Sequence, residues 1–127
     1  MQTHPSLNEL LEAVKHFIDK TATPNLEGHA SFHARIASNV LSIVLRDLEQ
    51  GKAAAMQEGQ QLAALLNASP DEDLQTLTRK LCDEISADKI TIETPGLLAH
   101  LKSSAIAQLN IDQPRYSGLK IAQETPE

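Results

Sequence analysis

Residues 32–49 carry the most continuous apolar pattern in the chain. On a helix with 3.6 residues per turn, their apolar side chains fill more than half of the circumference, which is wider than the stripe of a surface helix. These side chains are Phe32, Ile36, Ala37, Val40, Leu41, Ile43, Val44, Leu45 and Leu48. A narrow polar arc remains, made of Arg35, Ser38, Asn39, Ser42, Arg46 and Glu49. The pattern predicts a central helix over about residues 31–49, ended by a left-handed cap at Gly51 and covered on most sides by other helices.

Four further helices are predicted from apolar residues at helical spacing. Ser6 and Glu9 form a capping box at the start of the first, and Pro24 is expected to stop it near Lys20. A Ser or Thr followed by Pro, the signal of a helix start, occurs at Ser69 and at Thr94. The expected ranges are residues 6–20, 52–67, 69–87 and 95–110.

These elements indicate an all-α fold, a single compact bundle of about five helices around the central buried helix. We expect residues 1–117 to form this helical bundle domain. Ile90 and Ile92, between the last two helices, are expected to reach the core. Residues 118–127 have little to bury and are expected to form a mobile C-terminal tail.

The charge composition of the chain excludes some classes of binding partner. The chain has 127 residues, with 17 acidic against 11 basic side chains and a formal net charge of −6. Nucleic acids and anionic membranes attract concentrated positive charge, so neither is an expected partner. The single cysteine, Cys82, fits a reducing compartment, and no apolar run is long enough to span a bilayer. We therefore expect a cytoplasmic protein.

The sequence contains none of the common catalytic frameworks. It has no glycine-rich phosphate loop, no G-x-S-x-G, no H-E-x-x-H and no paired C-x-x-C. We expect a protein that is not an enzyme, with no catalytic residue and no cofactor. His29 and His33 have the spacing of two zinc ligands, but no third and fourth ligand is evident, so no metal site is expected.

Two polar residues fall on the apolar arc of the central helix and are expected to be buried. His33 is either a core histidine bonded to a backbone carbonyl or part of a ligand or partner site. Asp47 needs a cation near the helix end, for which Arg115 and Lys102 are the candidates.

The polar arc of the central helix is either solvated or tied to acidic residues on neighbouring helices, or it is a contact surface for another subunit. Its guanidinium groups could also hold a carboxylate or phosphate. Arg35, Asn39 and Arg46 lie on one side of the helix, where two guanidinium groups flank an amide. Tyr and Arg are common interface anchors, so a second candidate contact is the turn formed by Pro114, Arg115 and Tyr116.

Short motifs across about residues 5–117 resemble a small family of bacterial all-helical proteins of unknown function. They are Leu26-Glu27-Gly28, Phe32-His33-x-Arg35-Ile36-Ala37-x-Asn39, Leu97-Leu98-Ala99-His100-Leu101 and Asp112-x-Pro114-Arg115-Tyr116. The resemblance implies association with aminoglycoside-phosphotransferase-like kinases and acyl-CoA dehydrogenases of short-chain acid catabolism. In levulinate-type pathways such a protein is similar to the small subunit of a kinase that phosphorylates a 4-hydroxyacyl-CoA.

The resemblance therefore implies a non-catalytic accessory subunit that binds and supports a kinase, with ATP, Mg²⁺ and substrate held by the partner. Two alternatives stay open. One is a helical domain with a pocket in which His33 and Arg35 orient an acyl or carboxylate ligand. The other is a homodimeric structural protein, for which an exposed, self-complementary aliphatic strip is the expected sign.

Overall fold

The computed structural model describes residues 3–125, and the fold is all-α: these residues contain helices, turns and bends but no β-strand. The elements are α1 (Leu7–Phe17), a π-helical segment η1 (Ile18–Ala22), α2 (Thr23–Asn25), α3 (Gly28–Leu66), α4 (Leu74–Ser86), α5 (Leu97–Asp112) and α6 (Ser117–Glu124). Contacts divide the chain into two compact units, residues 1–50 and 51–127. The division falls within α3.

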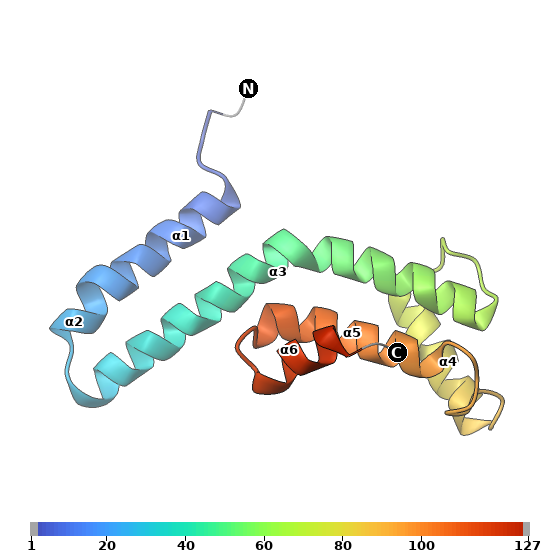
Figure 1. Ribbon diagram of the computed structural model, residues 1–127. Helices are drawn as coiled ribbons and strands as arrows, with labels where there is room; N and C mark the ends of the chain where they lie inside the picture. Colours follow the sequence, from blue (N-terminus) through green and yellow to red (C-terminus); the bar gives the residue numbers. More distant parts are fainter. Residues whose placement is uncertain (1–2, 126–127) are drawn as a thin grey trace. The chain divides into compact units, whose positions relative to one another are not determined.

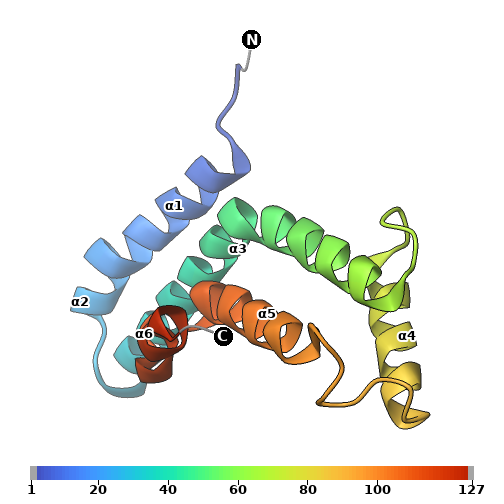
Figure 2. The same cartoon turned by 45° about the vertical axis from the view of Figure 1, so that its right-hand side comes forward.

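The first unit is a helical hairpin in which α1 runs antiparallel to the first part of α3 (Figures 1 and 2). Ser6 caps α1, as predicted, because its hydroxyl oxygen accepts the Glu9 amide at 3.2 Å. The predicted stop near Lys20 is wrong. The chain continues through η1, where the Thr23 amide donates to Ile18 five residues back. A π turn of this kind lets the helix reach Pro24, which has no amide proton to donate.

The central helix is longer than its pattern predicted. Residues 28–66 form one helix of 39 residues, so the predicted cap at Gly51 is wrong, and so is the separation of residues 31–49 from 52–67. Glycine inside a helix costs about 1 kcal/mol relative to alanine. Helix-forming residues on both sides of Gly51 offset that cost.

The second unit has a core where α4, α5 and the second part of α3 meet. The buried cluster consists of Leu62, Ala63, Leu77, Leu81, Ile90 and Leu97. Ile90 belongs to this cluster, which confirms the prediction that it reaches the core. Ile92 is 75% exposed and does not reach the core. Helix α4 begins after Asp73, whose carboxylate accepts the Thr76 amide at 3.3 Å, so the predicted start at Ser69 is too early.

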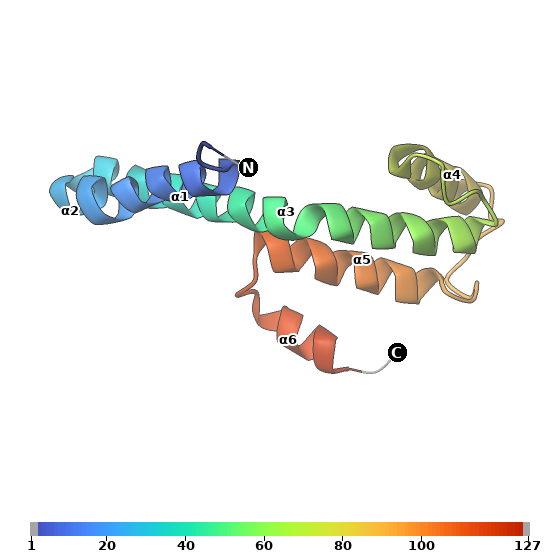
Figure 3. The ribbon, with the colours of Figure 1, turned by 90° about the horizontal axis from the view of Figure 1, so that it is seen from above.

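The segment after residue 117 does bury side-chain surface. Residues 117–124 form α6, which packs against α5 (Figure 3). Leu119 is only 4% exposed. The expectation that this segment has little to bury is therefore wrong, because the third residue of α6, Leu119, is buried.

Candidate functional site

The predicted central helix is not buried on most sides. Along the first part of α3, a row of large apolar side chains at four-residue spacing is exposed: Phe32, Ile36, Val40, Val44 and Leu48. Val40 is 51% and Val44 is 38% exposed. The apolar residues do occupy a wide arc of the helix. Within the first unit, however, only the other arm of the hairpin packs against this part of α3, and much of the arc is left uncovered.

The buried side of the helix is the side with small residues. Ser38, predicted on the polar arc, is buried, and Ser31 and Ala34 on the same side are half-buried. Small side chains allow two helices to approach closely. The hydroxyl of Ser31 also donates to the Thr23 carbonyl at 3.3 Å, which ties the turn to α3.

Ser38 takes part in a polar contact between the two arms of the hairpin. Its hydroxyl donates to the Asp19 carboxylate, whose other oxygen receives Lys15 Nζ at 2.6 Å. The Lys15 hydrogen bond, followed by the Ser38 hydrogen bond, lowers the pKa of Asp19 below its ordinary 3.8. The contact therefore favours the ionised carboxylate and fixes the pairing of η1 with α3.

Helix α1 carries a second exposed apolar row, at spacings of three and four residues: Leu7, Leu10, Val14 and Phe17. The neighbouring positions Leu11, Lys15 and Ile18 are half-buried. We call the two rows together, Leu7, Leu10, Val14 and Phe17 with Phe32, Ile36, Val40, Val44 and Leu48, the hairpin apolar surface. It belongs entirely to the first unit.

His33 and Asp47 are both exposed, so the prediction that they are buried is wrong. The reason is the orientation of α3, which turns Ser31, Ala34 and Ser38 inward and leaves His33 and Asp47 on its exposed side. The ring of His33 lies edge-on to Phe32 with centroids 5.7 Å apart. Of the two cations proposed for Asp47, Lys102 donates instead to the Thr125 carbonyl at 2.8 Å.

The polar contact candidates occupy accessible positions. On α3, Arg35 and Asn39 are exposed and Arg46 is half-buried, and their spacing places them on one side of the helix beside the exposed apolar row. Pro114, Arg115 and Tyr116 are exposed in the link between α5 and α6, in the second unit.

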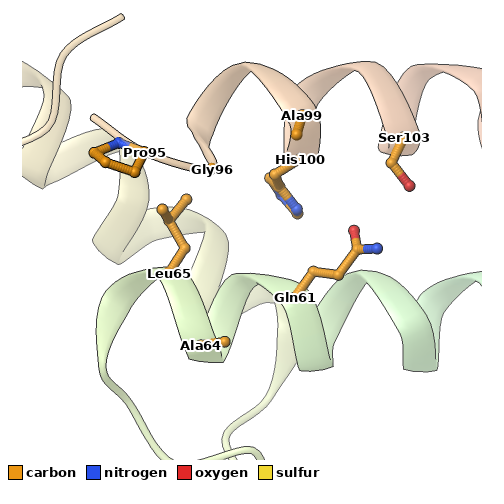
Figure 4. A pocket seen from close by; sticks show the side chains of 8 residues that line it. All are labelled: Gln61, Ala64, Leu65, Pro95, Gly96, Ala99, His100 and Ser103. Atoms are coloured by element: carbon orange, nitrogen blue, oxygen red, sulfur yellow. The ribbon is translucent and has the colours of Figure 1, made fainter. Parts of the chain in front are cut away.

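The second unit holds a cavity that the sequence patterns did not indicate. Between α3 and the start of α5, Gln61, His100 and Ser103 line it together with small and apolar residues (Figure 4). In the sequence, His100 belongs to the motif Leu97-Leu98-Ala99-His100-Leu101, which by itself assigns it no role. Its spacing from Leu97 and Ile111, both buried, places it on the inner face of α5, and this is the signal that identifies it.

Within residues 3–125, no group of three or more His, Cys, Asp or Glu side chains is arranged to hold a metal ion. None of the helices described combines the length and the apolar character needed to cross a membrane.

No curated protein and no solved structure matches the chain. A family model does match residues 24–116, which cover all of α3, α4 and α5. That model describes a domain of unknown function, DUF6285, and the chain belongs to this family.

Proposed function

We propose that this protein is a non-catalytic accessory subunit that binds another protein through the hairpin apolar surface. The observation that carries the proposal is the row of five large apolar side chains on α3, from Phe32 to Leu48, that is left exposed, together with a second exposed row on α1. Large apolar side chains exposed in a row on a protein surface are typical of interaction sites. Covering half of one such side chain contributes about 1 kcal/mol.

The residues around the apolar row suit the edge of an interface. Arg35, Asn39 and Arg46 lie beside it on α3. Protein interfaces commonly have an apolar centre with a polar rim, and arginine is frequent among the residues that dominate binding. These side chains supply orientation and the apolar row supplies most of the binding energy.

The partner in this proposal is an aminoglycoside-phosphotransferase-like kinase that acts on a hydroxyacyl-CoA in short-chain acid catabolism. This part rests on the family resemblance of the motifs around Phe32 and Tyr116. The kinase would contribute ATP, Mg²⁺ and substrate, and the present chain would contribute binding surface. The link at Pro114, Arg115 and Tyr116 is a further candidate contact.

Co-expression with such a kinase from the same organism tests the proposal. A tagged form of the chain should retain the kinase, and Val40→Glu should abolish retention without loss of helicity by circular dichroism. Ile92→Glu is the matched control, because Ile92 is an exposed isoleucine outside the hairpin. It should leave retention unchanged.

Two results would count against the proposal. One is a kinase that is soluble and fully active by itself and is not retained by the chain. The other is a homodimer of the chain, seen by light scattering and broken by Val40→Glu, in the absence of any kinase binding. The second result would assign the same surface to self-association.

A further inference from the structure

The cavity in the second unit has a polar end and an apolar end. Its volume is about 490 Å³, within the range of small-molecule sites. Figure 4 shows Leu65 and Pro95 together at one end, Gln61 and Ser103 at the other, and the ring of His100 between them. A ligand with a polar head and a short apolar tail would match this division.

His100 is the observation that points to a ligand. Its side chain lies on the inner face of α5 and the residue is only 6% exposed, yet its Nδ1 atom is buried without a hydrogen-bond partner. Leaving a buried polar atom unpaired costs about 1–3 kcal/mol. A neighbouring hydroxyl on α5 does have a partner, since Ser104 donates to Glu58 at 2.9 Å. A ring nitrogen without a partner, on a residue that lines a cavity, is available to recognise a ligand.

The charges around the cavity favour a neutral head group. None of the residues that line the cavity is a lysine, an arginine or a carboxylate. The nearest charge along α3 is Glu58, one turn before Gln61, and the chain as a whole has a net charge of −6. A carboxylate or phosphate head would lose its hydration without gaining a cation. Gln61 and Ser103 can each donate and accept, as an amide or a hydroxyl requires.

We infer that this cavity binds a small uncharged organic molecule with an amide or hydroxyl head and a short aliphatic tail. The head bonds to Gln61, Ser103 and the unpaired Nδ1 of His100. The tail lies against Leu65, Pro95 and Ala99. This site is separate from the hairpin apolar surface and does not depend on the proposed function.

Hexanamide and hexanoate are suitable probes because they differ in charge and share the same tail. A titration of the full chain, followed by amide and histidine-ring chemical shifts in NMR, should show saturable binding of hexanamide at the resonances of Gln61, Ala99, His100 and Ser103. Hexanoate should bind at least about tenfold more weakly, because the cavity offers its charge no counterion.

Two variants locate the binding. His100→Asn removes the ring, and Ala64→Leu fills the cavity from an exposed position that is not part of the core cluster. Each should weaken hexanamide binding at least about tenfold. His33→Asn, at an exposed histidine outside the cavity, is the control and should bind hexanamide like the parent.

Should His100→Asn fail to fold, Ala64→Leu decides the question alone. Absence of hexanamide binding by the full chain, equal binding of hexanoate, or unchanged affinity in the folded Ala64→Leu variant would each overturn the inference.

Discussion

Gly96 and Gly59 differ in backbone conformation, although one directly precedes a helix and the other lies inside one. Gly96 is the N-cap of α5 with φ +93°, a conformation that side chains with a Cβ rarely adopt. A Cβ there would meet Leu65 Cδ1 at an ordinary 3.6 Å, so the constraint is the backbone and not crowding. Gly59 lies in α3, and a Cβ on it would meet no atom within 4 Å apart from its chain neighbours and the backbone of its own helix.

The same substitution should therefore have opposite effects at these two sites. Gly96→Ala should lower the free energy of unfolding by about 1–2 kcal/mol, the cost of a left-handed residue with a Cβ. Gly59→Ala should raise it by about 0.5–1 kcal/mol, because alanine loses less backbone entropy in a helix. Urea denaturation followed by circular dichroism measures both, and a stabilising Gly96→Ala would contradict the backbone argument.

The contact between Ser38 and Asp19 makes stability depend on pH. Since Lys15 and Ser38 lower the pKa of Asp19 below 3.8 in the folded protein, the contact stabilises the fold above that pH. The contribution is lost as the pH falls through the lowered pKa. Ser38→Ala should therefore destabilise the protein at neutral pH, with a difference from the parent that shrinks below pH 3.8.

Unfolding free energies measured between pH 7 and pH 2 test this behaviour. Ser42→Ala is the control, because the Ser42 hydroxyl donates to the Ser38 backbone carbonyl and not to a carboxylate. Its effect should not depend on pH in this range. If Ser38→Ala lowers the free energy of unfolding by the same amount down to pH 2, the stabilisation does not depend on the ionised Asp19.

At the scale of elements, α6 packs against α5 and has one buried side chain among its residues. Leu119 is buried, whereas Ile121 on the same helix is 67% exposed. Leu119→Ala should cost about 2–4 kcal/mol, the usual effect of truncating a buried leucine. Ile121→Ala should change stability by less than about 0.5 kcal/mol. Thermal unfolding of the two variants against the parent gives the comparison, and equal melting temperatures would show that α6 does not anchor through Leu119.

Element types could be predicted from the sequence better than element ends. The Ser6 cap follows from local chemistry and is present. The helix predicted from Thr94 and Pro95 is also present, but it begins at Leu97 after a left-handed Gly96, so the predicted start at Pro95 with Thr94 as its cap is wrong. The ends at Gly51 and near Lys20 were wrong because a glycine and a proline only bias the backbone. A long helix tolerates the glycine, and η1 lets the chain pass through Pro24.

The candidate site shows what a helical pattern leaves undecided. Periodicity identified the apolar arc containing Val40 and Val44 but not which side of α3 another helix covers. Ser38 is buried because small side chains allow close packing, and hydrophobicity alone assigns it to the outside. His100 and Gln61 are 39 positions apart, and only the pairing of α3 with α5 brings them to one cavity.

For the molecule as a whole, the exposed apolar surface predicts behaviour without a partner. The isolated chain should self-associate as its concentration rises and should bind a hydrophobic dye, because uncovered apolar area favours any contact that removes water. Ile36→Glu with Val40→Glu should suppress both effects in sedimentation velocity and dye fluorescence. The control is Leu98→Glu, at an exposed leucine on α5. A chain that remains monomeric at high concentration and does not bind the dye would contradict the expectation.

The link between α5 and α6 contains Tyr116, whose fluorescence can report on this part of the protein. Tyr116 is the only tyrosine, and the chain contains no tryptophan. Nearly all of its near-ultraviolet absorbance and fluorescence therefore come from this one ring. That ring lies close to Gly118, where an added Cβ would come within 2.8 Å of Tyr116 Cε1. Its intrinsic fluorescence will therefore follow the release of α6 without any introduced label.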